Sequence, residues 1–542
     1  ISWGNTIQNK NTKQINASLN TRTLYNNLNK LYVQIDKKVN PEKYEKKKTK
    51  KTKSKDDKED PDKSIKQKLK ERERGKGRGK KKKTISGQII ERLVTGLKTF
   101  SINYTENEGT TLPGFMPAPT FGGNNMNMSA PGPEFLFGYQ PSNAWLDSIA
   151  MIPGILSNDP MMNQQLLRNR DYNFNARAAL EPIRSFRIDI NMKSNFTISS
   201  TEFFKDTSGL GDFEHLNPIA NGNLSVSYIT WNTIFDQRDA NGISNTFKQF
   251  EMNRLEISER LSDANPNSNG TNTDGYYEGY GPTSQDVLIP AFLAAYTGQS
   301  SGDINIKSPI KNNPRPLPNW RVTYSGLSKI KALKKIFKSV TFNHSYSSTY
   351  SINSFQSALL FEENLGHPVV KNNAENFFPE HEISQITITE QLAPLIGIDV
   401  RMQNNLTAKF NYQIMRTLNM SFLNYQLGEQ SSKEIKLGIG YKIRGLSLPF
   451  KMGTLTKLKN ELTCKFDFAI RDSKNMIHKL DQNISEPTGG TKMITLAPSA
   501  DYILNQNITL RFFLDWKKTI PYTSTSYPIT NMNTGVTLRY TL

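Results

Sequence analysis

The residues that could support catalysis or metal binding are few and widely spaced. The five histidines include no H-E-x-x-H spacing, which would place two imidazoles on one helix face. Glu380 and Glu382 flank His381, but three adjacent loop residues do not converge on one metal without further ligands. Residues 75–80, GKGRGK, have the glycines of a phosphate loop but neither a preceding strand nor a following Lys-Ser/Thr. There is no G-x-S-x-G elbow either. The sequence therefore predicts no enzyme activity, no metal site and no cofactor.

The elements around these residues follow a period of two. Apolar and polar side chains alternate through residues 433–444, 459–471 and 533–542, and through most of the last 370 residues or so. This pattern predicts antiparallel β-strands and an all-β fold. The expected apolar-face positions in these three strands are Ile435, Leu437, Ile439, Tyr441, Phe466, Phe468, Val536, Leu538, Tyr540 and Leu542. Cys464, the single cysteine, falls on the same face as a small hydrophobic residue.

Two architectures produce such alternation, a soluble sandwich and a transmembrane barrel. The chain is only 36% hydrophobic with a mean hydropathy of −0.59, and no apolar run approaches the ~18 residues of a membrane helix. Strand length favours the barrel, because a spanning strand needs ~9–11 residues and the usual soluble strand has ~5–6. We therefore expect an antiparallel transmembrane β-barrel wall of about 14–16 strands within a larger barrel.

Residues 501–516 are predicted to form one spanning strand. Tyr502 and Trp516 are fourteen positions apart, which is ~46 Å along a strand and ~33 Å across the membrane at a 45° tilt. We expect these two aromatic residues to lie at the two membrane interfaces, on either side of an apolar band ~25 Å tall. The lipid-facing positions between them would be Leu504, Ile508, Leu510, Phe512 and Leu514.

Several long phrases resemble one protein family. They include SINYTENEGTTLPGF (101–115), VLIPAFLAAYTG (287–298), LPNWRVTYSGLSK (317–329) and TSTSYPITNMNTGVTLRYTL (523–542). These phrases resemble the C-terminal region of the SprA family, also called Sov. That family is the outer-membrane translocon of the Bacteroidetes type nine secretion system, with a gliding-motility role in some members. The resemblance extends from about residue 95 onward.

The resemblance implies a location and a set of partners. It implies a Gram-negative outer membrane and a single-chain barrel whose lumen passes folded cargo proteins with C-terminal export domains. A PorV-type shuttle barrel and a periplasmic plug protein would bind at a lateral gate. This chain would contact outer-membrane lipid and the rest of the same barrel. It opens without the export signal that such a protein needs, so we expect a piece of a longer protein.

The strand pattern divides the chain into five parts. These are a barrel strand in 1–20, a Lys-rich helical or disordered insertion in 21–97, barrel strands with loops in 98–232, a helical and loop insertion in 233–318, and C-terminal barrel strands in 319–542. The expected strands lie near 12–20, 98–105, 133–139, 170–180, 183–204, 223–232, 319–325, 338–352, 384–402, 405–413, 418–425, 433–444, 459–471, 502–516 and 533–542.

The insertion 233–318 has two interpretations, a cap or plug that restricts the pore and a packed decoration of the rim. If the chain ends in the periplasm, counting strands backward puts 233–318 outside the cell and 21–97 in the periplasm. The same count puts 426–432 and 472–501 in the periplasm and 353–383, 445–458 and 517–532 outside.

Residues 41–83 carry 21 Lys or Arg and 9 Asp or Glu, a net of +12 within the chain's +20. Nucleic-acid binding is disfavoured, because aromatic residues are not interleaved and a barrel rim meets no nucleic acid. The alternatives are a solvated loop with one short helix and an electrostatic arm toward anionic lipid, cell-wall polymers or an acidic partner. The candidate contacts of such an arm are Lys46, Lys47, Lys48, Lys80, Lys81, Lys82 and Lys83.

Two other functions stay open. A nutrient receptor or passive porin would have the same barrel but would not transport proteins. A soluble β-rich adhesin would have neither the barrel nor the transport function. An energised receptor needs a plug domain and an N-terminal energy-coupling box, and neither is visible in this sequence.

Overall fold

The computed structural model describes residues 3–21, 23, 34, 96–118, 120, 124, 126, 131–239, 241–271, 275–445, 447–452, 455–457, 461–504, 507–523 and 526–541. The chain divides into two compact units. The larger comprises Ile1–Ala17, Ile102–Arg177 and Ile188–Leu542, and the smaller comprises Ser18–Ser101 and Ala178–Arg187. In the smaller unit the Thr21 hydroxyl donates to the Leu97 carbonyl, and Lys98 pairs with Glu181 at 3.3 Å. The lysines of the proposed electrostatic arm, Lys46–Lys48 and Lys80–Lys83, lie outside the described residues.

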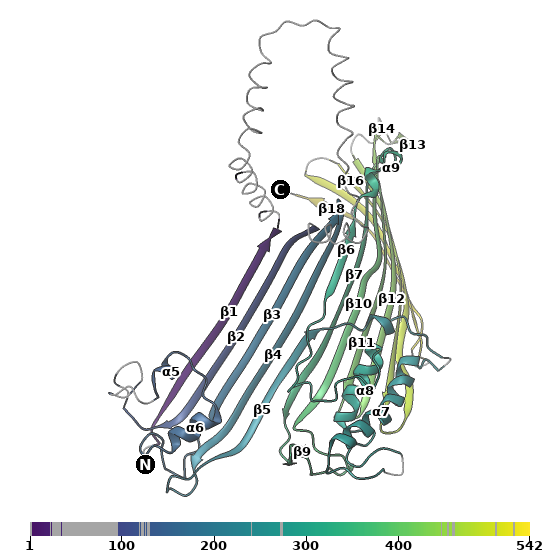
Figure 1. Ribbon diagram of the computed structural model, residues 1–542. Helices are drawn as coiled ribbons and strands as arrows, with labels where there is room; N and C mark the ends of the chain where they lie inside the picture. The colour runs from purple at the N-terminus through teal and green to yellow at the C-terminus, as the bar shows by residue number, and fades with distance from the viewer. Residues whose placement is uncertain are drawn as a thin grey trace, which may run out of the picture. The chain divides into compact units, whose positions relative to one another are not determined.

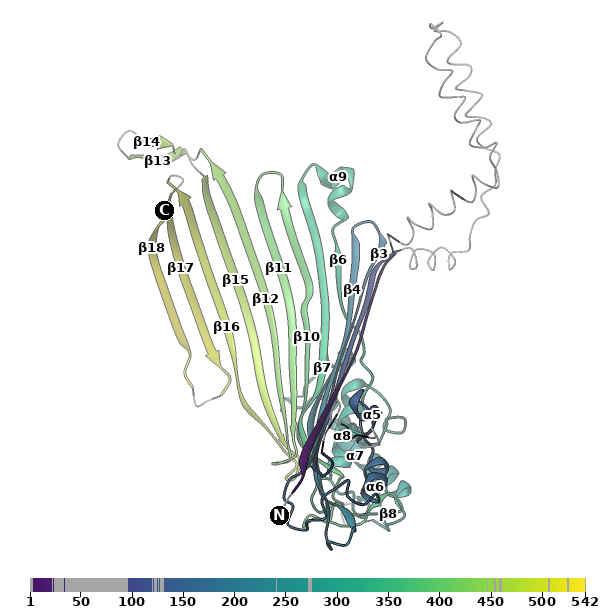
Figure 2. The same ribbon diagram turned by 90° about the vertical axis from the view of Figure 1, so that its left-hand side faces the viewer.

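One large β-sheet organises the described residues, and its strands from β4 to β18 pair antiparallel (Figure 1, Figure 2). Its order is β1 (Asn5–Asn20), β2 (Leu97–Phe115), β3 (Leu166–Ile183), β4 (Phe186–Asp206), β5 (Phe213–Ser227), β7 (Phe337–Ser357), β10 (His381–Met402), β11 (Leu406–Ser421), β12 (Gln426–Arg444), β15 (Glu461–Lys479), β16 (Ile484–Ile503), β17 (Ile508–Pro521) and β18 (Ile529–Tyr540). With β6 (Asn319–Tyr324), which pairs with β4 and β7, the sheet has 14 strands. The predicted all-β antiparallel class is confirmed. In the described residues β1 and β18 do not pair with each other, so the closed barrel stays a prediction.

Short elements connect these strands. The hairpins β8 (Glu363–Asn364) with β9 (His367–Pro368) and β13 (Ser447–Met452) with β14 (Leu455–Lys457) are separate two-stranded sheets. The helical elements are α5 (Pro133–Leu136), α6 (Asn143–Ala150), η1 (Trp231–Thr233), α7 (Asn245–Ala264), α8 (Gln285–Thr297), η2 (Leu327–Lys329) and α9 (Lys331–Lys334). Among the described residues, no helix combines the length and hydrophobicity needed to span a membrane.

Helices α7 and α8 have local sequence signals at their ends. The Ser244 hydroxyl accepts from the Phe247 amide at 3.1 Å and caps the N-terminus of α7. Helix α8 ends at Gly298, whose φ of 70° is the left-handed conformation that glycine adopts without a Cβ penalty. One face of α7, with Phe247, Phe250, Ile257 and Leu261, is buried in the core.

The insertion that holds α7 and α8 interrupts a single strand position. Strands β5 and β6 both pair with β7, at Ser227↔Thr349 and Trp320↔Tyr346. The Leu317 amide donates to the Ser227 carbonyl at 2.8 Å, so the chain returns to the point that it left. Residues 228–318 therefore leave and re-enter the sheet in mid-strand. Counting 223–232 and 319–325 as two crossings was wrong, because together they complete one.

Three other strand predictions were also wrong. Residues 133–136 form helix α5, with Pro133 in its first turn, where the missing amide costs no hydrogen bond. The strands expected at 405–413 and 418–425 are one strand, β11, which pairs without a register shift against β12. Arg416 interrupts its apolar alternation and suggested a break between them.

The strand expected at 501–516 is two strands. The chain turns between Ile503 and Ile508, and Tyr502 pairs with Leu510, while Trp516 pairs with Leu496. The whole of β16 was missed because Pro487, Pro498 and two glycines reduce its β signal. The connections 421–426 and 479–484 thus lie at the end of the sheet opposite Tyr540, and 444–461 lies at the Tyr540 end. The predicted sides of 426–432, 472–501 and 445–458 are therefore reversed relative to the chain's end.

Candidate functional site

The C-terminal half of the sheet carries an apolar band on one face. In antiparallel pairs, residues directly opposite each other point to the same face, so pairing extends each side chain into a row. Five successive rows across β11–β16 are apolar, three of them continue with apolar residues into β17 and β18, and the first meets Lys518 and Thr530 there; we call the five rows the apolar band. They are Tyr412–Ile435–Ile470–Ile494; Phe410–Leu437–Phe468–Leu496–Trp516–Met532; Ala408–Ile439–Phe466–Pro498; Leu406–Tyr441–Cys464–Ala500–Phe512–Val536; and Ile443–Leu462–Tyr502–Leu510–Leu538.

The structure brings together most of the positions predicted from the sequence. Exposed are Ile435, Ile439, Tyr441, Phe466, Leu504, Phe512, Val536, Leu538 and Tyr540; partly buried are Leu437, Phe468, Tyr502, Ile508, Leu510, Leu514 and Trp516. Leu542 lies outside the described residues, and Leu504 lies in the turn after β16 rather than in a strand. Val536 and Leu538 are 61% and 62% exposed. A contiguous exposed apolar surface of this kind marks an interaction with a membrane or a protein.

The opposite face of the same strands is polar. Its rows include Lys409–Gly438–Asp467 and Lys442–Thr463–Asp501–Arg511–Thr537. Ion pairs link neighbouring strands there, such as Lys442–Glu461 at 2.6 Å and Lys465–Asp501 at 3.5 Å. Exposed ion pairs contribute little stability, so they indicate contact with water rather than a stabilising core. The sheet therefore separates an apolar surface from a hydrated one.

The apolar band has a charged border at one end. One row beyond Ile435, the same face carries Lys433, Asp472 and Lys492. On β12 the band extends over eight positions from Ile435 to Ile443, which is ~26 Å along the strand and ~20 Å along the normal at a ~40° tilt. This height is close to the ~25 Å apolar band of a membrane barrel wall. Tyr441 and Tyr502 lie toward one border and Tyr412 and Trp516 toward the other, although Tyr502 and Trp516 belong to different strands.

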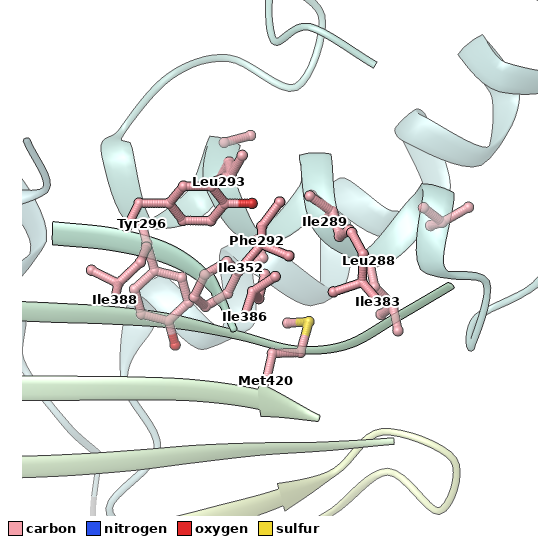
Figure 3. Packing of buried hydrophobic residues seen from close by; sticks show 14 of the residues in the cluster. Leu288, Ile289, Phe292, Leu293, Tyr296, Ile352, Ile383, Ile386, Ile388 and Met420 are labelled. Carbon is pink, nitrogen blue, oxygen red and sulfur yellow. The ribbon is translucent and has the colours of Figure 1, made fainter. Parts of the chain in front are cut away.

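Helices α7 and α8 pack on the face that carries the apolar band, next to it. Leu427 is fully buried in their core, and β12 alternates without a shift from Leu427 to Ile435. On β15, His478 stacks on Phe247 of α7 with ring centroids 3.7 Å apart, and it shares the face of Phe468. Figure 3 shows the side chains of α8 against those of the sheet. The contacts are Leu288, Phe292 and Tyr296 against Ile352, Ile386, Ile388 and Met420.

A buried polar network anchors the insertion to the sheet. Arg416 donates to Glu390 at 2.6 Å and to the Thr233 carbonyl at 2.9 Å, and Tyr346 donates to Glu390 at 2.7 Å. The Tyr296 hydroxyl donates to Glu429 at 2.9 Å. Burial raises the pKa of the Tyr296 phenol well above its usual value, so it remains a donor at neutral pH.

Sequence reasoning missed this network. Arg416 and Glu390 are 6% and 0% exposed, and a charged residue on an apolar face looks like a break in the strand. The signal that could have found it is the opposite charge of two face-breaking residues on successive strands, β10 and β11.

These features identify the class of the protein as an antiparallel all-β sheet protein with one apolar face and one polar face. Comparison with protein-family models and with curated proteins gave no match to the chain. Within the described residues, no group of three or more His, Cys, Asp or Glu side chains could hold a metal ion.

Proposed function

We propose that this chain forms part of the wall of a protein-conducting channel in the outer membrane of a Gram-negative bacterium. The apolar band faces lipid and the polar face lines the lumen. The observation that carries this proposal is the bounded apolar band backed, strand by strand, by a hydrated face. A soluble protein that exposed such a band would lose the free energy of its burial, about 25 cal/mol per Å².

The sheet edges support a larger assembly. In the described residues β1 and β18 each have one unpaired side, and a bilayer tolerates no unpaired strand edge. We propose that further strands of the same barrel pair with them. The packing of α7 and α8 on the apolar-band face supports placing the insertion outside the lumen, as part of the rim rather than as a plug.

The resemblance to the SprA family supports the identity of the cargo. We propose that folded proteins with C-terminal export domains cross the lumen, in a type nine secretion system with a possible gliding-motility role. A PorV-type shuttle barrel and a periplasmic plug protein are the proposed gating partners. A nutrient receptor or porin would share the wall but not the cargo.

Paired cysteine variants test which face meets lipid. In a Cys464→Ser background, Phe466→Cys and Lys465→Cys lie on adjacent positions of β15 but on opposite faces. In intact membranes, a water-soluble maleimide should label Lys465→Cys and leave Phe466→Cys unlabelled until detergent is added. Equal labelling of both positions would contradict the membrane wall.

Depletion of the protein tests the transport function separately. Cargo with the export domain should then accumulate in the periplasm and disappear from the cell surface. Normal secretion after depletion would end the translocon proposal, while the labelling result would still stand for the wall.

A further inference from the structure

A polar cavity lies where the insertion meets the apolar band. It has a volume of about 420 Å³ and lies between the segment after η1 and strands β11, β12 and β15. Its lining includes Arg238, Arg416, Ser431, Lys433 and Lys474. Lys433 precedes Ile435 by two positions on the same face, so the cavity adjoins the first row of the apolar band.

The acidic groups of the cavity already have partners. Asp236 accepts from the Thr246 amide and hydroxyl at 2.6 and 2.7 Å. Glu429 pairs with Arg238 at 2.8 Å, and Asp472 accepts from the Tyr522 hydroxyl at 3.0 Å. The carboxylates are therefore matched by groups of the protein itself.

The cations of the cavity are in excess. Among the described residues, Lys433 and Lys474 are exposed and have no carboxylate within ion-pair distance. The Lys474 ammonium lies 5.4 Å from the centre of the Tyr522 ring. The Arg416 side chain is 6% exposed; its Nη1 and Nη2 donate to Thr233 and Glu390, and its Nε has no hydrogen-bond partner. A buried donor without a protein partner in a polar cavity can bond an acceptor there, either a water or an oxygen of a bound group.

We propose that this cavity binds the phosphate group of a membrane lipid whose acyl chains lie along the apolar band. Lys433 and Lys474 supply the charge for the phosphate oxygens, and Ile435 and the rows beyond it cover the chains. Exposed Phe235, also in the lining, provides an aromatic side chain at the height where head groups and chains meet. The inference rests on the proposed function, because it requires that the band faces lipid.

Native mass spectrometry of the full chain in detergent tests the site. Phosphatidic acid and diacylglycerol with the same acyl chains are the probes, and the protein should retain phosphatidic acid preferentially. Replacing both cations, Lys433→Gln with Lys474→Gln, should reduce that preference about 25-fold, or about fivefold for each lysine. Each single variant supports the same test if the double variant fails to fold.

Lys409→Gln with Lys517→Gln is the matched control, since both lysines lie on the polar face. The control should keep the full preference. Unchanged preference in the Lys433 and Lys474 variants would overturn the inference, and so would complete displacement by inorganic phosphate at equal concentration, which would show a free-phosphate site. Failure of the native chain to insert into vesicles would instead refute the proposed function.

Discussion

A charge placed in the middle of the apolar band gives the most direct test of the wall. Phe466 lies in the third of the five rows, two rows from either border. If that row is near the bilayer midplane, Phe466→Lys should destabilise the folded protein by ~2–4 kcal/mol, and Leu538→Lys, in the outermost row, by only ~0–1 kcal/mol. The difference arises because the cost of a lysine on the lipid face depends on its depth.

The free energy of unfolding can be measured by urea titration in lipid vesicles, with heat-modifiable gel mobility reporting the folded fraction. Phe466→Leu is the control for lost aromatic packing, and Arg539→Ser tests the polar face beside Leu538, where the change should be almost neutral. On a water-exposed face, both lysine variants would stay within ~0.5 kcal/mol of the native protein. Equal tolerance of lysine in the two rows would therefore refute the lipid-facing band.

Three further predictions follow from other parts of the chain. Glu390→Gln should destabilise the docked insertion by ~3–5 kcal/mol, because it leaves the buried Arg416 charge uncompensated, and limited proteolysis should then cut within 228–318. Burial and the nearby Glu380 raise the pKa of Asp286 to about 6, so the folded protein keeps this proton at a pH where the unfolded chain has lost it. The free energy of unfolding should therefore fall by up to ~3 kcal/mol as the pH rises from about 4 to 6. Asp286→Asn should abolish that pH dependence in thermal unfolding. Deleting residues 43–83 should leave the heat-modifiable fold intact, with any defect in partner recruitment sensitive to salt.

The apolar band could be predicted because strand alternation is a local property. Each position from Ile435 to Tyr441 and from Val536 to Tyr540 follows from its neighbours two residues away. The same reasoning failed at β16, where Pro498 and the glycine pair Gly489 and Gly490 weaken the local preference for a strand. Pairing with β15 and β17 supplies what the local sequence lacks.

The position of the insertion could not be predicted from the sequence. A helical insertion was expected at 233–318, but nothing local to Ser227 or Asn319 shows that the two complete one strand position. That fact depends on a pairing with β7, more than one hundred residues from Ser227. A strand count made from the sequence alone therefore counts this one crossing twice.

A single row of the sheet explains why the insertion leaves in mid-strand. The row Ser348–Glu390–Arg416–Ser431–Lys474 crosses β7, β10, β11, β12 and β15, all on the face of the apolar band. Asn319, at the start of β6, hydrogen-bonds Ser348 through both its side-chain oxygen and nitrogen.

On one side of this row α7 and α8 cover the apolar side chains of the sheet. On the other side Leu392 and Ile414 are buried with Ile234, and the exposed apolar side chains begin beyond them. Both regions have the same hydrophobic pattern, so the apolar side chains of both must be shielded from water. The chain supplies its own cover up to this row and for one row beyond it, and the rows of the apolar band that follow are partly or fully exposed. This row and the next are therefore the level at which protein packing would give way to lipid. The excess cations of Lys433 and Lys474 lie at that level, where a phosphate would be expected.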